Sequence, residues 1–309
     1  YVEMPVTILA NQCPATRGVA MEKPKILLQL DSNPQACPFD SVVAIDAGVD
    51  HLLQYHAVEP AQVQGLVHNA MFPRTESLDR TAIFVGGSDV AAGERLLQAV
   101  TDSFFGPMRI SVMMDANGAN TTAAAAVLAV SRHIDLSQSN CLVLAATGPV
   151  GQRVVRLLAR QGAQVRVASR QRERAESVCQ RVAEALSSTQ LTPVQTADLE
   201  ELKGAIDGVD VVVAAGTGGV ALLPEEVRNS SDSLKVVIDL NAVPPLGVEG
   251  LEVTAKKVEQ HGAICYGAIG VGGTKMKIHL AAIQKLFTTN DLVLDADEIF
   301  TIGQELEVN

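Results

Sequence analysis

Two closely spaced glycines and the helical pattern after them predict a site for a dinucleotide. Gly148 and Gly151 follow an apolar run over 142–146 and open a helical pattern over 150–161. They match the last two glycines of G-x-G-x-x-G, which let the backbone approach a pyrophosphate and let the helix pack on its strand. The N-terminus of such a helix attracts phosphate oxygens. The alternative is a glycine turn in an ordinary α/β unit.

Further residues near these glycines are expected to contact the same cofactor. Ala146 stands where the first glycine of the motif is expected, so the turn there must keep a negative φ or bear strain. The expected cofactor-binding residues are Thr147, Gly148, Pro149, Val150 and Gly151, with Gly216 and Asn241 at later strand ends.

The end of the next strand favours NADP over NAD. An NAD site places a carboxylate about 20 residues after the glycines, where it binds the ribose 2′-hydroxyl. Here Ser169 and Arg170 occupy that place, followed by Arg172 and Arg174. A hydroxyl and a guanidinium would hold a 2′-phosphate, which a carboxylate would repel. The alternative is that Arg170 is a solvated charge at the start of a helix.

Candidates for binding a substrate lie elsewhere in the chain. Lys275 follows Gly272-Gly273 and precedes an amphipathic pattern, so the alternative for it is a solvated helix-surface lysine, and Lys277 is a second candidate. Polar residues also follow predicted strands, where ligands bind in open α/β sheets, although turns favour the same residue types. The candidate substrate-binding residues are Asp46, Asp89, Asp115, Asn117 and Thr121.

The elements that position these residues alternate between strands and helices. Strands are predicted over 25–30, 41–46, 81–85, 109–114, 210–215, 235–240 and 263–266. Helices are predicted over 61–70, 90–105, 274–287 and 295–307, with a further helix capped by Asn120. The fold class is therefore α/β, with a Rossmann-type doubly wound parallel sheet, a second α/β domain and an active site in the cleft between them.

The predicted domain boundaries follow from these elements. Residues 1–22 form an N-terminal extension that lacks the features of a signal peptide. Residues 23–122 form the substrate domain, completed by C-terminal helices over 275–309, and residues 123–274 form the NADP-binding domain.

Composition excludes several classes of partner. The net charge of −11 disfavours nucleic acid and anionic membrane surfaces, and aromatic residues are only 3% of the chain. The six histidines show no metal-ligand spacing, so no metal is expected. Five scattered cysteines without C-x-x-C fit a reduced cytoplasm, and no apolar run is long enough to span a membrane.

Several segments between about Lys25 and Ile302 carry a family resemblance. Some are not general features of dinucleotide-binding folds, above all Phe104-Phe-Gly-Pro107 and Asn117-Gly-Ala-Asn-Thr-Thr-Ala-Ala-Ala125. Others are Phe39-Asp40, Thr147-Gly-Pro-Val-Gly151, Asp239-Leu-Asn-Ala-Val-Pro-Pro-Leu-Gly247 and Gly267-Ala-Ile-Gly-Val-Gly-Gly-Thr-Lys275. The chain thereby resembles the NADP-dependent methylene-tetrahydromethanopterin dehydrogenases of methylotrophic bacteria, which also accept methylene-tetrahydrofolate.

The resemblance implies a two-domain subunit with the pterin in the interdomain cleft, a homo-oligomer, NADP as cofactor and Lys275 as the residue that positions the pterin. A hydride would pass from the methylene carbon to NADP⁺ and leave a methenyl cation. No proton moves in that step, so the enzyme needs orientation and negative potential rather than a general acid or base. Asp46, Asp89 and Asp115 are the candidate sources of that potential. Because an ammonium would oppose the cation, Lys275 is expected to lie away from the reacting carbon.

Two other functions remain open at this point. One is an NADP-dependent dehydrogenase of a small hydroxy or amino acid, similar to shikimate or amino-acid dehydrogenases, which would need an acid or base in the cleft. The other is a non-catalytic NADP-binding protein. Cyclohydrolase activity is not expected, since bifunctional folate dehydrogenases use a lysine four residues after a tyrosine. Here Glu59 stands four residues after Tyr55, and no lysine occurs between Lys25 and Lys203.

Overall fold

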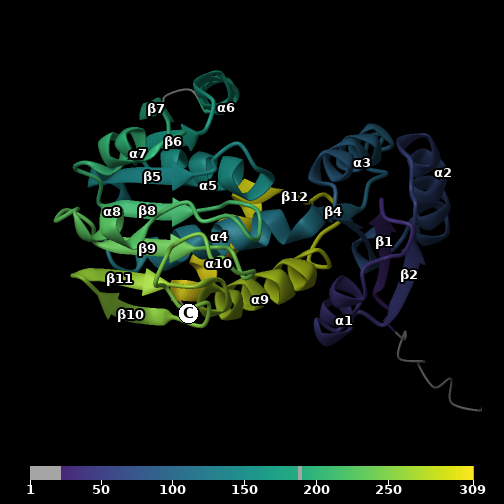
Figure 1. Ribbon diagram of the computed structural model, residues 1–309. Helices are drawn as coiled ribbons and strands as arrows, with labels where there is room; N and C mark the ends of the chain where they lie inside the picture. Colours follow the sequence, from purple (N-terminus) through teal and green to yellow (C-terminus); the bar gives the residue numbers. More distant parts are fainter. Residues whose placement is uncertain (1–21, 187–189, 309) are drawn as a thin grey trace, which may run out of the picture.

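The computed structural model describes residues 22–186 and 190–308. The protein contains two β-sheets with surrounding helices, and long helices join the two sheets (Figure 1). Almost all of the predicted N-terminal extension lies outside the described residues. None of the helices in the described ranges is long and apolar enough to cross a membrane.

The first sheet has five strands in the order β12-β4-β3-β1-β2, and all of its pairs are parallel. Its strands are β1 (Ile26–Asp31), β2 (His51–Tyr55), β3 (Thr81–Gly86), β4 (Ser111–Met114) and β12 (Val293–Leu294). The helices between them are α1 (Pro38–Asp46), α2 (Pro60–Met71) and α3 (Val90–Asp102). All six residues of β3 are buried, as expected for an inner strand of a sheet covered on both faces.

The second sheet has seven strands in the order β10-β11-β9-β8-β5-β6-β7. They are β5 (Asn140–Leu144), β6 (Gln164–Ser169), β7 (Gln190–Gln195), β8 (Val211–Ala214), β9 (Val236–Asp239), β10 (Lys256–Gln260) and β11 (Ala263–Tyr266). Only β10 is antiparallel to its neighbour. The helices α5 (Pro149–Arg160), α6 (Arg172–Ala185), α7 (Leu199–Ile206) and α8 (Glu225–Asn229) connect the strands. The chain leaves β5 toward β6 on one side and later places β8 on the other, so a topological switch point lies at the carboxyl end of β5.

Two helices connect the two sheets, namely α4 (Ala119–Ser131) and α9 (Ala268–Lys285), and the last helix, α10 (Ala296–Val308), packs on both of them. In Figure 1 the sheets lie at opposite ends of the molecule, with α4 and α9 running between them. The run Ala123–Ala126 of α4 is fully buried, and its small side chains allow α5, α9 and α10 to pack closely on it. One hydrophobic core therefore continues from Leu27 and Phe84 of the first sheet to Val143 and Val165 of the second.

The structure differs from the predicted elements in several places. The helix predicted over 274–287 begins six residues earlier, as α9, because close packing of Gly270 on the backbone of Ala255 outweighs the low helix propensity of glycine. The predicted strand over 41–46 is part of α1, because a short apolar run has no decisive period and Pro38 favours a helix start. The edge strand β2 was not predicted, since its exposed and half-buried residues do not alternate cleanly. Asn120 does not cap α4; Gly118 does, and Asn120 lies buried in the first turn. The proposed domain boundaries remain a proposal.

Candidate active site

A cavity of about 270 Å³ opens at the carboxyl ends of β1, β3 and β4. Loop residues after these strands form one wall, and α1 and α9 form the other. The lining residues are Asn33, Cys37, Phe39, Asp40, Gly87, Ser88, Asp115, Asn117, Gly118, Lys275 and His279. Strand ends of one parallel sheet meet at one rim, which explains how segments far apart in the sequence converge here.

The loops of this rim are held in unusual backbone conformations. Gly87 has a φ of 105°, and a Cβ atom there would lie 2.3 Å from the hydroxyl oxygen of Ser32. Asn117 has a φ of 55°, which asparagine tolerates better than most residues. Gly118 has a φ of 59°, and a Cβ atom there would lie 2.3 Å from the Nζ atom of Lys275. Gly87 and Gly118 therefore allow the side chains of Ser32 and Lys275 to lie against the backbone of the rim.

Asp115 anchors the loop that leads from β4 into α4. Its buried carboxylate accepts hydrogen bonds from the backbone N–H groups of Asn120, at 2.9 Å, and Thr121, at 3.0 Å. It also accepts one from the Thr121 hydroxyl, at 2.6 Å. Of this pair of predicted substrate residues, Asp115 lines the cavity, whereas Thr121 is buried and its hydroxyl is occupied by this contact.

Lys275 lines the cavity from α9. Its Nζ atom lies 5.8 Å from the ring centroid of Phe39 and next to Gly118. Lys277, by contrast, is exposed and is not among the lining residues. The structure therefore separates the two lysines that the sequence left as alternatives.

Asp40 and His279 are site residues that sequence reasoning missed. Burial, helped by the charge of Asp115, raises the pKa of Asp40 to about 7. His279 lies one helical turn after Lys275 and is fully buried, with its ring stacked on Phe84 at a centroid distance of 5.5 Å. Burial lowers the pKa of His279, so its imidazole is neutral near neutral pH. Neither of its ring nitrogens has a hydrogen-bond partner among the described residues.

The signals for these two residues were present but weak. The i, i+4 spacing of Lys275 and His279 places both on one face of a helix. Asp40 was noted only as part of a segment similar to a family, and its neighbours in space are Asp31, Asp115 and Lys275. The site thus gathers three carboxyl groups and one ammonium, which favours a cationic species in the cavity.

Besides Thr121, two further predicted substrate residues lie outside the cavity. Asp46 is the exposed last residue of α1, because the segment predicted to end in a strand is a helix. Asp89 is exposed and caps α3, where its carboxylate accepts a hydrogen bond from the N–H of Ala92 at 3.1 Å. Its role in the structure is that of a helix cap. The fifth predicted substrate residue, Asn117, does line the cavity.

The glycine turn after β5 leads directly into α5. Gly148 is the N-cap residue of α5, Pro149 and Val150 begin its first turn, and no described side chain caps this helix. A Cβ atom on Gly151 would lie 2.8 Å from the carbonyl oxygen of Ala145, so only glycine fits there. A helix start of this kind can bind an anion through its first-turn N–H groups.

The strain expected at Ala146 lies one residue earlier. Ala145 has the positive φ, 53°, whereas Ala146 is buried and donates its N–H to the carbonyl of Ala168 at 2.9 Å. The carbonyl oxygen of Thr147 accepts a hydrogen bond from the Gln152 side chain at 2.7 Å, which helps to hold the turn.

The remaining predicted cofactor residues lie at other strand ends of the second sheet, and they differ in exposure and in their contacts. Ser169 ends β6 and is buried, with its hydroxyl near the N–H of Gln171, whereas Arg170 is exposed. Gly216 follows β8, and a Cβ atom there would lie 2.7 Å from Leu222. Asn241 uses its side-chain amide inside the loop after β9, bonding the backbone of Val243 and Pro245. Asn241 therefore shapes this rim through the loop.

Both halves of the chain match known protein families. Residues 38–117 match the family model described as methylene-tetrahydromethanopterin dehydrogenase, N-terminal. Residues 145–277 match the model described as NAD(P)H-binding. The second match covers the glycine turn, Arg170 and Lys275.

Two proteins of Methylorubrum extorquens are similar over nearly their whole length. One, named Bifunctional protein MdtA, is 40% identical over 91% of this chain and 99% of its own. The other, named NAD(P)-dependent methylenetetrahydromethanopterin dehydrogenase, is 28% identical over 91% of this chain and 98% of its own. Among solved structures, quinate dehydrogenase from Corynebacterium glutamicum aligns over 91% of this chain and 99% of its own, with 15% identity and a TM-score of 0.45. That likeness is too distant to carry a functional argument.

Proposed function

The chain belongs to the methylene-tetrahydromethanopterin dehydrogenase family, and on that basis we propose that it oxidises a methylene-tetrahydropterin with NADP⁺. The observation that carries this proposal is the cavity at the rim of the first sheet. It combines the carboxyl groups of Asp40 and Asp115 with Lys275 and the neutral imidazole of His279. The two carboxyl groups lie in the segment that matches the pterin-dehydrogenase model, and the lysine and histidine lie on α9.

In the proposed reaction, the C–H bond of the methylene carbon breaks and its electron pair passes as a hydride to the nicotinamide ring. The pterin becomes a methenyl cation, and no proton is transferred. Asp40 and Asp115 supply negative potential where the cation forms. Lys275 holds an oxygen of the pterin ring away from the reacting carbon, because its charge opposes the cation. His279 offers a neutral hydrogen-bonding group on the same face of α9.

In the proposed function, residues of the second sheet bind and orient NADP⁺. The uncapped first turn of α5 receives the pyrophosphate, and the exposed guanidinium of Arg170 binds the 2′-phosphate beside Ser169. Gly216 lies at the neighbouring strand end, where its lack of a side chain lets Leu222 pack close to this rim.

The proposed function is tested by following NADP⁺ reduction with saturating methylene-tetrahydromethanopterin beside methylene-tetrahydrofolate. We expect NADPH to form with the methanopterin substrate, and the comparison measures how far the folate is accepted. If neither pterin is oxidised while NADP⁺ still binds in calorimetry, the protein is not this dehydrogenase, and a hydroxy-acid dehydrogenase or an NADP-binding protein becomes the better hypothesis.

Replacing Lys275 with alanine should lower kcat/KM for the pterin at least about tenfold, or 1.4 kcal/mol. The reason is that Lys275 lines the cavity, with its Nζ atom between Phe39 and Gly118. Lys277→Ala is the matched control, because Lys277 lies two residues away on α9 but is exposed. Initial rates with varied pterin give the measurement. Equal turnover by the parent and both variants would show that Lys275 does not touch the substrate.

We also propose that the protein does not hydrolyse the methenyl product. Tyr55 lies in a separate cavity with His56 and Gln62, away from Lys275. Among the described lining residues of the active-site cavity, Lys275 is the only lysine, and an arginine cannot exchange a proton at neutral pH. The expected result is that methenyl-pterin without nicotinamide decays no faster with the protein than in buffer. A decay rate that rises in proportion to protein, and is absent with heat-denatured protein, would overturn this proposal.

The remaining parts of the proposal concern the setting of the enzyme. We propose a reduced, cytoplasmic location, with which the free thiols of Cys37, Cys141, Cys179 and Cys265 are compatible. We also propose a homo-oligomer, which light scattering of the purified protein would detect as a mass that is a multiple of 32.6 kDa.

A further inference from the structure

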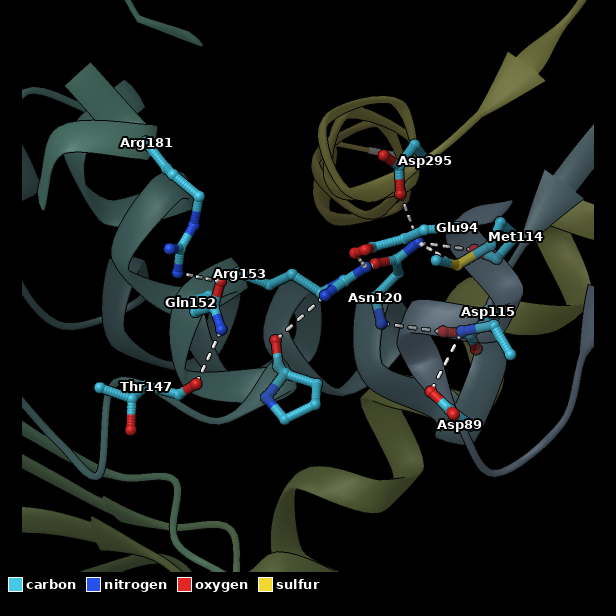
Figure 2. Close-up of polar contacts among 12 residues, drawn as sticks. Asp89, Glu94, Met114, Asp115, Asn120, Thr147, Gln152, Arg153, Arg181 and Asp295 are labelled. Atoms are coloured by element: carbon cyan, nitrogen blue, oxygen red, sulfur yellow. Dashed lines mark hydrogen bonds and ion pairs between the residues drawn. The ribbon is translucent and has the colours of Figure 1, made fainter. Parts of the chain in front are cut away.

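A buried arginine on α5 joins the nucleotide turn to the loops of the first sheet. Arg153 is 9% exposed and lies one turn into the helix that begins at Pro149. Figure 2 shows its side chain extending from α5 toward Asn120 of α4 and Glu94 of α3. A buried guanidinium is stable only when its donors are paired, so its partners define its position.

Each part of the Arg153 guanidinium has a partner on a different element. Its Nε atom donates to the Oδ1 atom of Asn120. One terminal nitrogen donates to the carbonyl oxygen of Pro149 at 3.2 Å, and the other donates to Glu94 at 3.0 Å. The planar, fixed fork of an arginine can hold three such groups at once, whereas a lysine ammonium on a flexible stem cannot hold all three in this geometry.

Asn120 carries the connection onward to the cavity. Its side-chain Nδ2 atom donates to the carbonyl of Met114 at 2.6 Å and to the carboxylate of Asp295 at 2.8 Å. Its backbone N–H donates to Asp115 at 2.9 Å, and Asp115 lines the cavity. A chain of hydrogen bonds thus runs from the first residue of α5 to a carboxylate of the active site.

Packing at the same place supports this connection. Val150, in the first turn of α5, packs against the core shared by both sheets and also against the outer core of the first sheet. The start of the nucleotide helix is therefore held to the first sheet by apolar contact on one side and by Arg153 on the other. Arg156, one turn later on the same helix, instead pairs with Asp297 at the start of α10.

We infer that Arg153 is a positioning residue for hydride transfer, which fixes the nucleotide turn at a set distance from Asp115 and hence from the pterin. This inference rests on the proposed function. Hydride transfer needs the donor carbon and acceptor carbon in near contact, and a displacement of about 1 Å can reduce the rate about 100-fold. Arg153 acts without touching either ligand, by holding the two binding sites at a fixed distance from each other.

The test compares Arg153→Lys and Glu94→Gln with the control Arg156→Lys. For Arg153→Lys we expect the single-turnover rate of hydride transfer to fall between about tenfold and about 100-fold. The dissociation constants of NADP⁺ and of the pterin, each measured alone by calorimetry, should stay within about threefold of the parent values. Glu94→Gln should show a smaller loss of the same kind, because an amide oxygen still accepts from Arg153. Arg156→Lys should keep the parental single-turnover rate.

Thermal unfolding of each variant separates positioning from stability. A lower Tm together with a parental single-turnover rate per folded site would show that Arg153 is only a structural residue and would overturn the inference. A loss of NADP⁺ affinity that accounts for the whole loss of rate would overturn it as well. If the parent itself oxidises neither pterin, the proposed function has failed rather than the role of Arg153.

Discussion

Replacing Arg170 with aspartate is expected to lower kcat/KM for NADP⁺ by about 1.5–3 kcal/mol, the range for a hydrogen bond to a charged group. Arg170 follows the last residue of β6, at the rim that binds the adenosine ribose in this fold, and its side chain is exposed. The guanidinium can pair with a 2′-phosphate, and a carboxylate in its place would repel that phosphate. Efficiency with NAD⁺, which lacks the phosphate, should fall little or rise.

The measurement is kcat/KM for NADP⁺ and for NAD⁺ at fixed pterin concentration. Arg172→Asp is the control, because Arg172 is also exposed but is held by Glu176 at 3.1 Å. Its preference for NADP⁺ should stay close to the parental value. If the parent uses NAD⁺ and NADP⁺ equally well, and Arg170→Asp leaves that ratio unchanged, Arg170 is a solvated charge at the start of α6.

Replacing Asp40 with asparagine is expected to lower kcat about 100-fold above neutral pH. A carboxylate about 6 Å from a forming cation, at an effective dielectric constant of about 20, contributes about 3 kcal/mol, or about two orders of magnitude in rate. Because the pKa of Asp40 is about 7, the parental kcat should rise with pH through about 7 and then level off. The asparagine variant should lose this pH dependence.

The control for this substitution is Asp46→Asn on the same helix, where the carboxylate is exposed and outside the cavity. It should keep both the rate and the pH profile of the parent. If Asp40→Asn retained a parental profile with its inflection near neutral pH, another group would be responsible for the titration.

The stability of Asp40→Asn gives a second check on the raised pKa. The folded protein holds the Asp40 carboxyl at a pKa of about 7, above the ordinary value of 3.8, so ionisation opposes folding. This destabilisation is absent below about pH 4, grows between about pH 4 and about pH 7, and is complete above that range. Over this window the variant should gain at least about 1.4 kcal/mol relative to the parent, which corresponds to one pKa unit. Denaturant unfolding at both ends of the window measures it.

The strand–turn–helix–strand unit of the nucleotide half could be predicted from the order of its residues. Gly148, Gly151 and Arg170 belong to one strand–turn–helix–strand unit, in which neighbouring residues are also neighbours in space. The requirement for glycine at position 151 is set by the turn that follows β5, since Ala145 and Ala146 leave no room for a Cβ atom. Such steric limits on the backbone depend on residues that are close in sequence, so they can be predicted from it. The NAD(P)H-binding family match covers the same segment.

The substrate half depended on contacts that the order of residues does not show. The predicted strand over 41–46 is a helix, because four or five apolar residues fit either element until the sheet they pack against is known. That error placed Asp46 at the rim, whereas α1 instead brings Asp40 to it. The raised pKa of Asp40 comes from burial and from Asp115, which lies 75 positions later.

The connection between the two halves was decided by tertiary structure alone. In the sequence, nothing distinguishes Arg153 from the other arginines of the same amphipathic helix. It is buried only because α3, α4 and α5 meet at the joint of the two sheets, where Glu94, Asn120 and Pro149 offer three acceptors around one guanidinium. Local sequence sets which backbone conformations and turns are possible, whereas burial, charge coupling and long-range pairing arise only when separate elements pack together.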